Sequence, residues 1–200
     1  DSTLITIECI DEIADMQGLK PQVAAITEAA MRGELDFAAS LKQRVALLEG
    51  LDASALQRVY DERLKLSPGA EAMLAAVQKA GLKTLLVSGG FTFFTERLKE
   101  RLGLDYTHAN ALEIIDGKLT GKVLGGIVDA EEKQRTVERV CAELGISPSE
   151  AIVMGDGAND LKMMGIAGLS VAFRAKPVVR SQADVALNFV GLDGLLNVLS

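Results

Sequence analysis

The chain has 200 residues, of which 48% are hydrophobic and 24% charged, a composition typical of a globular protein with one domain, or one domain and a small insertion. Its formal net charge is -7 and it contains no block of lysine or arginine, so neither nucleic acid nor an anionic membrane surface is an expected partner. No apolar run approaches the roughly 18 residues of a membrane span.

The two cysteines, Cys9 and Cys141, lie far apart and outside any CxxC pattern. Isolated cysteines of this kind are typical of reduced thiols, which predicts a cytoplasmic protein. With His108 as its single histidine, the chain has almost no means of building a histidine–cysteine metal site. A bound metal is therefore expected to have oxygen ligands, which favours Mg²⁺.

The first third of the chain is predicted to be helical. Apolar residues recur at helical spacing, most clearly at Phe37, Leu41, Val45 and Leu48. No strand pattern interrupts this block, which ends where the composition changes at residues 67–69. Four helices are expected here, at residues 10–16, 21–35, 36–49 and 52–66.

After residue 69, helical patterns alternate with short apolar runs that are typical of buried strands. Helices are expected at residues 69–81, 91–103 and 130–145, and strands at residues 83–90, 105–109, 151–154 and 167–173. Residues 113–123 are predicted to form a β-hairpin with Asp116-Gly117 at its turn, and residues 184–190 and 191–199 close the chain. The alternation predicts an α/β fold with a doubly wound parallel sheet.

The run GDGANDLKMM, residues 155–164, concentrates acidic and flexible residues directly after the apolar run AIVM. Its glycines allow a sharp turn and a close approach to a ligand. Asp156 and Asp160 are four residues apart, so an early helical turn brings both carboxylates to one side, where a cation relieves their repulsion. The run indicates a Mg²⁺ site with Asn159 beside a bound anion, and helix capping is the alternative explanation.

Two further features are typical of phosphate binding. Ser88 supplies a hydroxyl, and Gly89 and Gly90 supply N–H groups just before a predicted helix. Lys133, at the start of the helix predicted for residues 130–145, has the charge to neutralise a phosphate oxygen. Each feature alone is also common in an ordinary turn or on a solvated helix.

The opening segment DSTLITIE carries two acids, Asp1 and Glu8. Asp1 and the small hydroxylated residues after it are typical of a loop at a strand end, while Glu8 precedes the first predicted helix, where the helix dipole favours an acid. Ligands of parallel sheets bind at the carboxyl ends of strands, so we expect this loop, the Ser88 turn and the GDGAND turn to converge.

Together these motifs resemble those of the haloacid dehalogenase-type phosphatases, and most closely the branch that acts on phosphoserine. The resemblance rests on DST, VSGGF, EEKQR and GDGANDLKMM, which occur in the family's order across essentially the whole chain. The helical block resembles the family's cap domain, and GELDFAASLKQRVALLEG is its most specific segment. The resemblance implies a Rossmann-like core at residues 1–10 and 68–200, with a small helical cap at residues 11–67.

The resemblance also implies an activity, the Mg²⁺-dependent hydrolysis of O-phospho-L-serine to serine and phosphate through an aspartyl-phosphate, the last step of serine biosynthesis. It implies that Asp1 acts as general acid and base, that Lys133 binds the phosphate, and that Asp1, Asp156 and Asp160 form the metal site. The substrate-binding residues that it implies are Glu8, Met31, Phe37, Arg44, Ser88, Gly89 and Asn159.

A physical argument supports the roles of Glu8 and Arg44. Phosphoserine carries an ammonium and a carboxylate in addition to its phosphate, so a selective site needs an anion for the amine and a forked cation for the carboxylate. A phosphatase without such selectivity would need neither residue.

One part of the family pattern lies outside the sequence. The nucleophilic aspartate of the family stands two positions before the residue that matches Asp1. The strand that carries it is central, and a sheet without it would have a gap lined by unpaired backbone groups. We therefore expect the sequence to be part of a longer chain, and we expect these residues alone to lack turnover by the family mechanism.

Two alternatives remain open. One is a related phosphotransferase that passes the phosphate to a small alcohol such as homoserine, and the other is a non-catalytic module that binds phosphoserine. An ion-pump domain, which shares the GDGxND motif, is excluded because membrane spans are lacking. The expected partner is a small molecule, with a homodimer left open.

Overall fold

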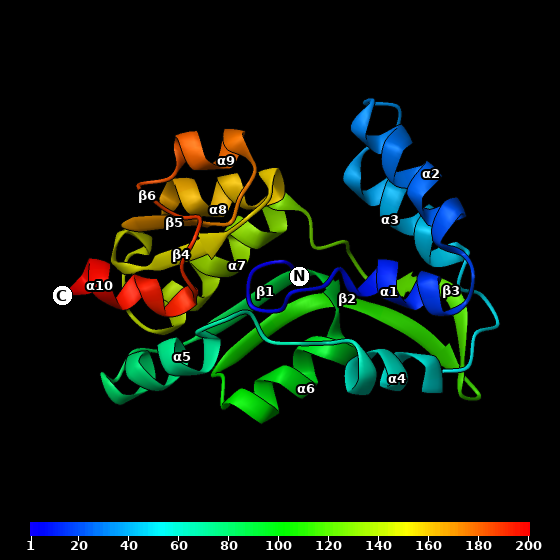
Figure 1. Cartoon of the computed structure of the whole chain (residues 1–200), viewed down its shortest axis with the longest axis horizontal. Helices are drawn as coiled ribbons and strands as arrows, with labels where there is room; N and C mark the ends of the chain where they lie inside the picture. The colour runs from blue at the N-terminus through cyan, green and yellow to red at the C-terminus, as the bar shows by residue number, and fades with distance from the viewer.

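The structure, a computed structural model, describes residues 1–200. In Figure 1 an arm formed by α2 (Lys20–Met31) and α3 (Phe37–Ala46) rises on one side, and a lobe containing β4 (Ile152–Gly155) and β5 (Leu169–Phe173) lies on the other. The N-terminus lies between the arm and this lobe. None of the helices combines the length and the apolar character that crossing a bilayer requires.

The helical block predicted for the first third is confirmed. Its helices are α1 (Cys9–Met16), α2, α3 and α4 (Ser54–Glu62). The first turn of α3 is fixed by Asp36, whose carboxylate accepts a 2.7 Å hydrogen bond from the Ala39 N–H. The sequence predicted that the fourth helix would extend to residue 66, but α4 ends at Glu62. Leu66 instead forms an antiparallel β-bridge with Ile5.

The predicted α/β architecture is confirmed, and its strands form two separate three-stranded sheets. In the first, β1 (Leu85–Phe91) is parallel to β2 (Tyr106–Ile115), which is antiparallel to β3 (Lys118–Leu124). In the second, β4, β5 and β6 (Val185–Leu187) are all parallel. β1 and β4 belong to different sheets and do not pair with each other.

The hairpin predicted for residues 113–123 is present as β2 and β3. Asp116 and Gly117 form its turn with φ angles of 52° and 74°, the positive values that a tight two-residue hairpin requires. The strand predicted at residues 105–109 is the start of β2, which continues to Ile115. Within residues 184–190, Val185–Leu187 forms β6 and pairs with β5.

Helices cover the strands, and one core joins them to the helical block. Ile13 of α1 and Val59 of α4 are buried in the same cluster as Phe94 of α6 and Leu119 of β3. The block is therefore anchored to the strands through α1, α3 and α4, and its assignment as a cap at residues 11–67 stays a prediction. The remaining helices are α5 (Ala70–Lys79), α6 (Thr92–Leu102), α7 (Ala130–Glu143), α8 (Leu161–Ile166), α9 (Pro177–Gln182) and α10 (Leu195–Leu199).

Candidate active site

The loop that begins at Asp1 lies at the carboxyl ends of both β1 and β4. On the β1 side, a Cβ atom at Gly90 would lie 3.3 Å from Asp1 Oδ1 and 3.1 Å from Ser88 Oγ. On the β4 side, the Thr3 hydroxyl donates a 2.9 Å hydrogen bond to Asp156 Oδ1. The three polar clusters singled out in the sequence therefore converge, as predicted.

Asp1 is held by the first residue of α1. Its Oδ2 accepts a 2.9 Å hydrogen bond from the Cys9 N–H, and its Oδ1 lies 3.6 Å from Cys9 Sγ. The carboxylate thus sits at the N-terminus of α1, where the helix dipole favours negative charge. Burial raises the pKa of the Cys9 thiol to about 12, so the thiol stays protonated and available as a donor. No sequence motif indicated this role of Cys9.

A buried ion pair organises the GDGAND turn. Lys133 Nζ donates a 2.8 Å hydrogen bond to Asp160 Oδ1. Asp160 Oδ2 accepts from the N–H groups of Asp156, at 3.1 Å, and Gly157, at 3.2 Å. Both oxygens of Asp160 are therefore engaged inside the protein, and this carboxylate fixes the position of Lys133 and the shape of the turn.

Asp156 is the carboxylate of this turn that has no cationic partner. Burial is the main cause that raises its pKa; the Thr3 hydrogen bond opposes the shift, and the negative charge of Asp160 adds to it. A half-buried carboxylate in this situation is stabilised by a cation at the cavity surface.

The three acids predicted to hold a metal do not form a single cluster of side chains. No group of three or more histidine, cysteine or acidic side chains in the chain is arranged to hold a metal ion. Asp160 is committed to Lys133 and to backbone N–H groups, and Asp1 to Cys9. Asp156 is the remaining carboxylate that could bind a metal ion. Mg²⁺ keeps much of its hydration when bound, so one carboxylate together with main-chain oxygens and water suits it.

Ser88 and its neighbours form a turn at the end of β1. Ser88 is buried, and its Oγ accepts a 2.9 Å hydrogen bond from the Gly90 N–H. Because an accepting hydroxyl keeps its own proton, Ser88 can still donate to a ligand. A Cβ atom at Gly89 would lie 3.0 Å from Phe37 Cζ, so the Phe37 ring of α3 covers this turn.

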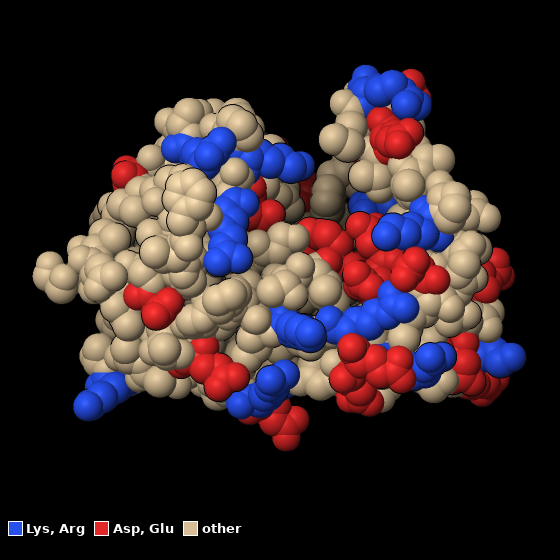
Figure 2. Space-filling view, viewed as in Figure 1, with Lys and Arg blue, Asp and Glu red and all other residues tan.

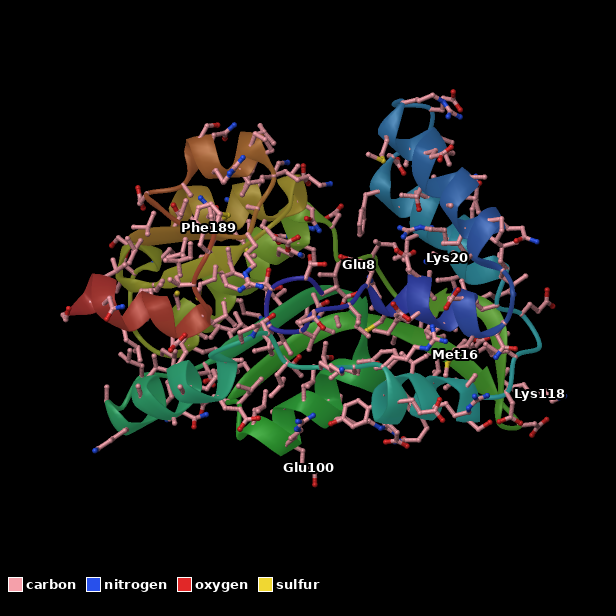
Figure 3. All side chains as sticks on the ribbon, in the orientation of Figure 1. Glu8, Met16, Lys20, Glu100, Lys118 and Phe189 are labelled. Carbon is pink, nitrogen blue, oxygen red and sulfur yellow. The ribbon has the colours of Figure 1, made fainter.

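Glu8 and Arg44 lie on the arm side of the site. Glu8 Oε1 accepts a 2.6 Å hydrogen bond from the Ser2 hydroxyl, and Arg44 Nε donates to the Ser40 carbonyl at 3.3 Å. Burial lowers the pKa of Arg44, while the charges of Asp11 and Glu8 oppose that shift. In Figure 3, Glu8 lies between the arm and the opposite lobe, and Figure 2 shows this face hollowed there, with acidic side chains gathered at the base.

All the residues that the sequence singled out line one cavity of about 1050 Å³. Met31 is exposed, with 75% of its surface accessible at the end of α2. Asn159 lies beside Gly157, where a Cβ atom would be 2.6 Å from Asn159 Oδ1. The full set is Asp1, Glu8, Met31, Phe37, Arg44, Ser88, Gly89, Lys133, Asp156, Asn159 and Asp160.

The protein has an α/β fold. Its carboxylates, the buried Lys133 and the serine–glycine turn line one cavity at the carboxyl ends of the strands. The model of the haloacid dehalogenase-like hydrolases matches residues 1–165, and the chain belongs to this family.

Several similar proteins are named phosphoserine phosphatase. The chain is 59% identical over 204 residues to phosphoserine phosphatase of Polaromonas sp., covering 100% of this chain and 86% of that protein. It is 52% identical over 200 residues to phosphoserine phosphatase of Haemophilus influenzae, covering 100% of this chain and 63% of that protein. A solved structure of a substrate-bound phosphoserine phosphatase complex has a TM-score of 0.91 and 39% identity, covering 99% of this chain and 94% of that one. The chain thus spans nearly all of some relatives and under two thirds of others.

Proposed function

We propose that the protein hydrolyses O-phospho-L-serine to L-serine and phosphate. The observation that carries this proposal is the position of Glu8 and Arg44, which line the same cavity as Ser88, Lys133 and Asp156. A zwitterionic amino acid bearing a phosphate needs an anion, a forked cation and a phosphate site within one cavity. The high identity to proteins named phosphoserine phosphatase supports the same substrate.

In the proposed complex the phosphate lies between the end of β1 and the start of α7. The Ser88 hydroxyl and the Gly89 N–H donate to its oxygens, and Lys133, held by Asp160, neutralises part of its charge. Asn159 donates from the opposite side. Glu8 binds the substrate ammonium, Arg44 binds its carboxylate, and Met31 and Phe37 cover the site.

Asp1 is proposed as the proton donor and acceptor. An aspartate two positions before Asp1, by resemblance to the family, attacks phosphorus, and the bond from phosphorus to the serine oxygen breaks. Asp1 gives its proton to that oxygen. It then takes a proton from the water that attacks the aspartyl-phosphate, which releases phosphate and restores both carboxyl groups.

Mg²⁺ is proposed as the metal, held by the Asp156 carboxylate and by the main-chain carbonyl of Asp1. When bound, it neutralises phosphate charge that would otherwise repel the attacking carboxylate. Asp160 supports this site by holding the turn that carries Asp156. The buried free thiols Cys9 and Cys141 fit a reducing compartment, so we also propose a cytoplasmic location.

The direct test is phosphate release from L-phosphoserine, with and without Mg²⁺. The 200-residue chain is compared with a form extended upstream so that an aspartate stands two positions before Asp1, and with the same extension carrying alanine there. Release by the aspartate form alone, and only with Mg²⁺, is the expected result. Binding of phosphoserine without release by any form would favour a non-catalytic module, and transfer of phosphate to added homoserine in preference to water would favour a phosphotransferase.

A further inference from the structure

Asn110 of β2 is a buried polar residue outside the cavity of the candidate site. Only 1% of its surface is exposed, and it does not line the cavity. Its Nδ2 donates a 2.8 Å hydrogen bond to the Gly89 carbonyl, and its Oδ1 accepts a 2.8 Å hydrogen bond from the Val128 N–H. The side chain therefore links the turn at the end of β1 to the segment that leads into α7.

The pairing of β1 with β2 explains why a side chain makes these hydrogen bonds. Val87 pairs with His108, and Phe91 pairs with Asn110. A step of four residues along β1 thus matches a step of two residues along β2, so residues 88–90 leave the regular ladder. Backbone groups that leave a ladder need other partners when they are buried. The amide of Asn110 is such a partner for the Gly89 carbonyl.

The peptide unit between Gly89 and Gly90 is held at both ends. Its C=O accepts from Asn110 Nδ2, and its N–H donates a 2.9 Å hydrogen bond to Ser88 Oγ. A peptide flanked by two glycines is otherwise free to rotate, because neither residue has a Cβ atom that restricts its backbone. Successive hydrogen bonds also polarise one another, which strengthens the bond to Ser88 Oγ. Asn110 therefore controls the orientation of the Ser88 hydroxyl through this peptide unit.

The second hydrogen bond of Asn110 reaches the start of α7. Val128 is 1% exposed and directly precedes Asp129, the N-cap of α7. The Asp129 carboxylate accepts a 2.8 Å hydrogen bond from the Glu132 N–H, and its carbonyl accepts a 2.9 Å hydrogen bond from the Lys133 N–H. The first turn of α7, which carries Lys133, is therefore fixed relative to Asn110 through Val128.

We propose that Asn110 is a positioning residue that sets the spacing between the Ser88–Gly89 turn and Lys133, and this inference rests on the proposed function. Asn110 itself does not touch the phosphate. Donors that are already in place bind an anion more tightly than donors that must first be ordered, because ordering costs binding free energy. Loss of the Asn110 amide should therefore weaken phosphate binding although no contact with the phosphate is removed.

The first test measures the Kd of inorganic phosphate for the 200-residue chain by isothermal titration calorimetry. Asn110→Leu keeps a similar volume but can neither donate nor accept, and Asn110→Ala is the second variant. Ser170→Ala is the matched control, because Ser170 is 4% exposed, exchanges two hydrogen bonds with Asp184 and does not line the cavity. Both Asn110 variants should raise the Kd by about tenfold or more, and Ser170→Ala should leave it unchanged.

The same titration separates positioning from a general loss of stability. A variant that is partly unfolded has fewer binding sites, which lowers the measured stoichiometry. The affinity of the sites that remain folded is unchanged in that case. A raised Kd at unchanged stoichiometry therefore reports the positioning role of Asn110, and circular dichroism verifies that each variant is folded.

The second test uses the unsubstituted chain and does not depend on the folding of a variant. Nuclear magnetic resonance follows the side-chain amide signals of Asn110 and the N–H signal of Gly90 while inorganic phosphate is added. Both should shift as the site becomes saturated, because the peptide unit between Gly89 and Gly90 couples them to Ser88. The N–H signal of Ser170, in the other sheet, should not shift.

The outcomes distinguish this inference from the proposed function. A parent chain that binds no phosphate would overturn the proposed phosphate site and, with it, the role of Asn110. Phosphate binding that is equally tight in the parent chain and in a folded Asn110 variant would overturn the role of Asn110 alone. Signals of Asn110 that stay unchanged when phosphate saturates the site would also overturn that role and leave the proposed function intact.

Discussion

Lys133 Nζ lies 2.8 Å from Asp160 Oδ1, with only 7% and 6% of the two side chains exposed, so each charge depends on the other. Removing one partner leaves a buried charge without compensation. We therefore expect Asp160→Ala to lower the free energy of unfolding by about 3–5 kcal/mol.

Urea denaturation measures this effect, and the exposed pair of Lys162 and Glu131 is the matched control. That pair is 3.0 Å apart, with 51% and 61% of its side chains exposed, and Lys162→Ala should change stability by under about 1 kcal/mol. Similar decreases in the free energy of unfolding for both variants would show that burial of the Lys133–Asp160 pair does not add to its contribution to stability.

Gly155 is required by the close approach of Asp160. A Cβ atom at Gly155 would lie 2.6 Å from Asp160 Cβ, a distance that demands movement of the turn. Gly155→Ala should therefore lower the Tm and weaken phosphate binding. Gly165→Ala in α8 meets nothing within 4 Å and should raise stability by about 0.5–1 kcal/mol, because alanine favours a helix. A Gly155→Ala variant as stable as the Gly165→Ala variant would contradict this account.

The sequence predicted the secondary structure well where the pattern is local. The stripe that includes Leu41, Val45 and Leu48 identified α3, and the Asp116-Gly117 pair identified the hairpin turn. The predicted end of α4 was wrong, because Leu66 forms a long-range β-bridge with Ile5 in place of the last helical turn. No local pattern contains such a contact, which joins residues far apart in the chain.

The sequence predicted which residues belong to the candidate site. It did not predict which of them form hydrogen bonds with one another. Clusters at strand ends converge in any parallel sheet, so Asp156 and Ser88 could be placed at one edge from sequence alone. The contact of Cys9 with Asp1 could not, because a cysteine at the first turn of a helix usually reports only burial. The role of Asp160 as partner of Lys133 depends on the packing of α7 against the GDGAND turn, which periodicity does not encode.

Cys9 tests how Asp1 is held. The thiol is 1% exposed and its pKa is raised to about 12 by burial, so we expect no reaction with a thiol reagent at pH 8 until the protein unfolds. Cys9→Ser keeps a donor for Asp1, whereas Cys9→Val removes it and keeps an apolar volume. In the extended, active form, Cys9→Val should alter the pH profile of kcat more than Cys9→Ser does. Equal pH profiles for the two variants would show that Cys9 contributes to packing and does not act as a hydrogen-bond donor to Asp1.

Asp156 links pH, stability and metal binding. Because its pKa in the folded state is raised above the unfolded value, the folded state binds more protons between these two values, and stability falls as pH rises through that interval. Without metal, Asp156→Asn should therefore be more stable than the parent chain at pH 7. The difference should vanish below about pH 4, near the unfolded pKa.

Added Mg²⁺ should reverse that order at pH 7. An ion that binds only the folded state raises the Tm with its concentration, and Asp156→Asn should lose this response. Thr3→Val, which removes the hydroxyl donor to Asp156 but keeps the carboxylate, is the control and should retain it. A Tm that rises equally with Mg²⁺ in the parent chain and in Asp156→Asn would place the metal elsewhere.

Arg44 tests the choice of substrate. Its guanidinium lines the cavity on α3, and burial lowers its pKa, so its desolvated charge is stabilised when a carboxylate binds. In the extended form, Arg44→Ala should raise the KM for phosphoserine by about 10- to 100-fold, the equivalent of one charged hydrogen-bonded contact. The KM for p-nitrophenyl phosphate, which has no carboxylate, should change little. Lys42→Ala on the exposed face of α3 should alter neither KM. Equal increases for both substrates would show that Arg44 shapes the cavity without recognising the carboxylate.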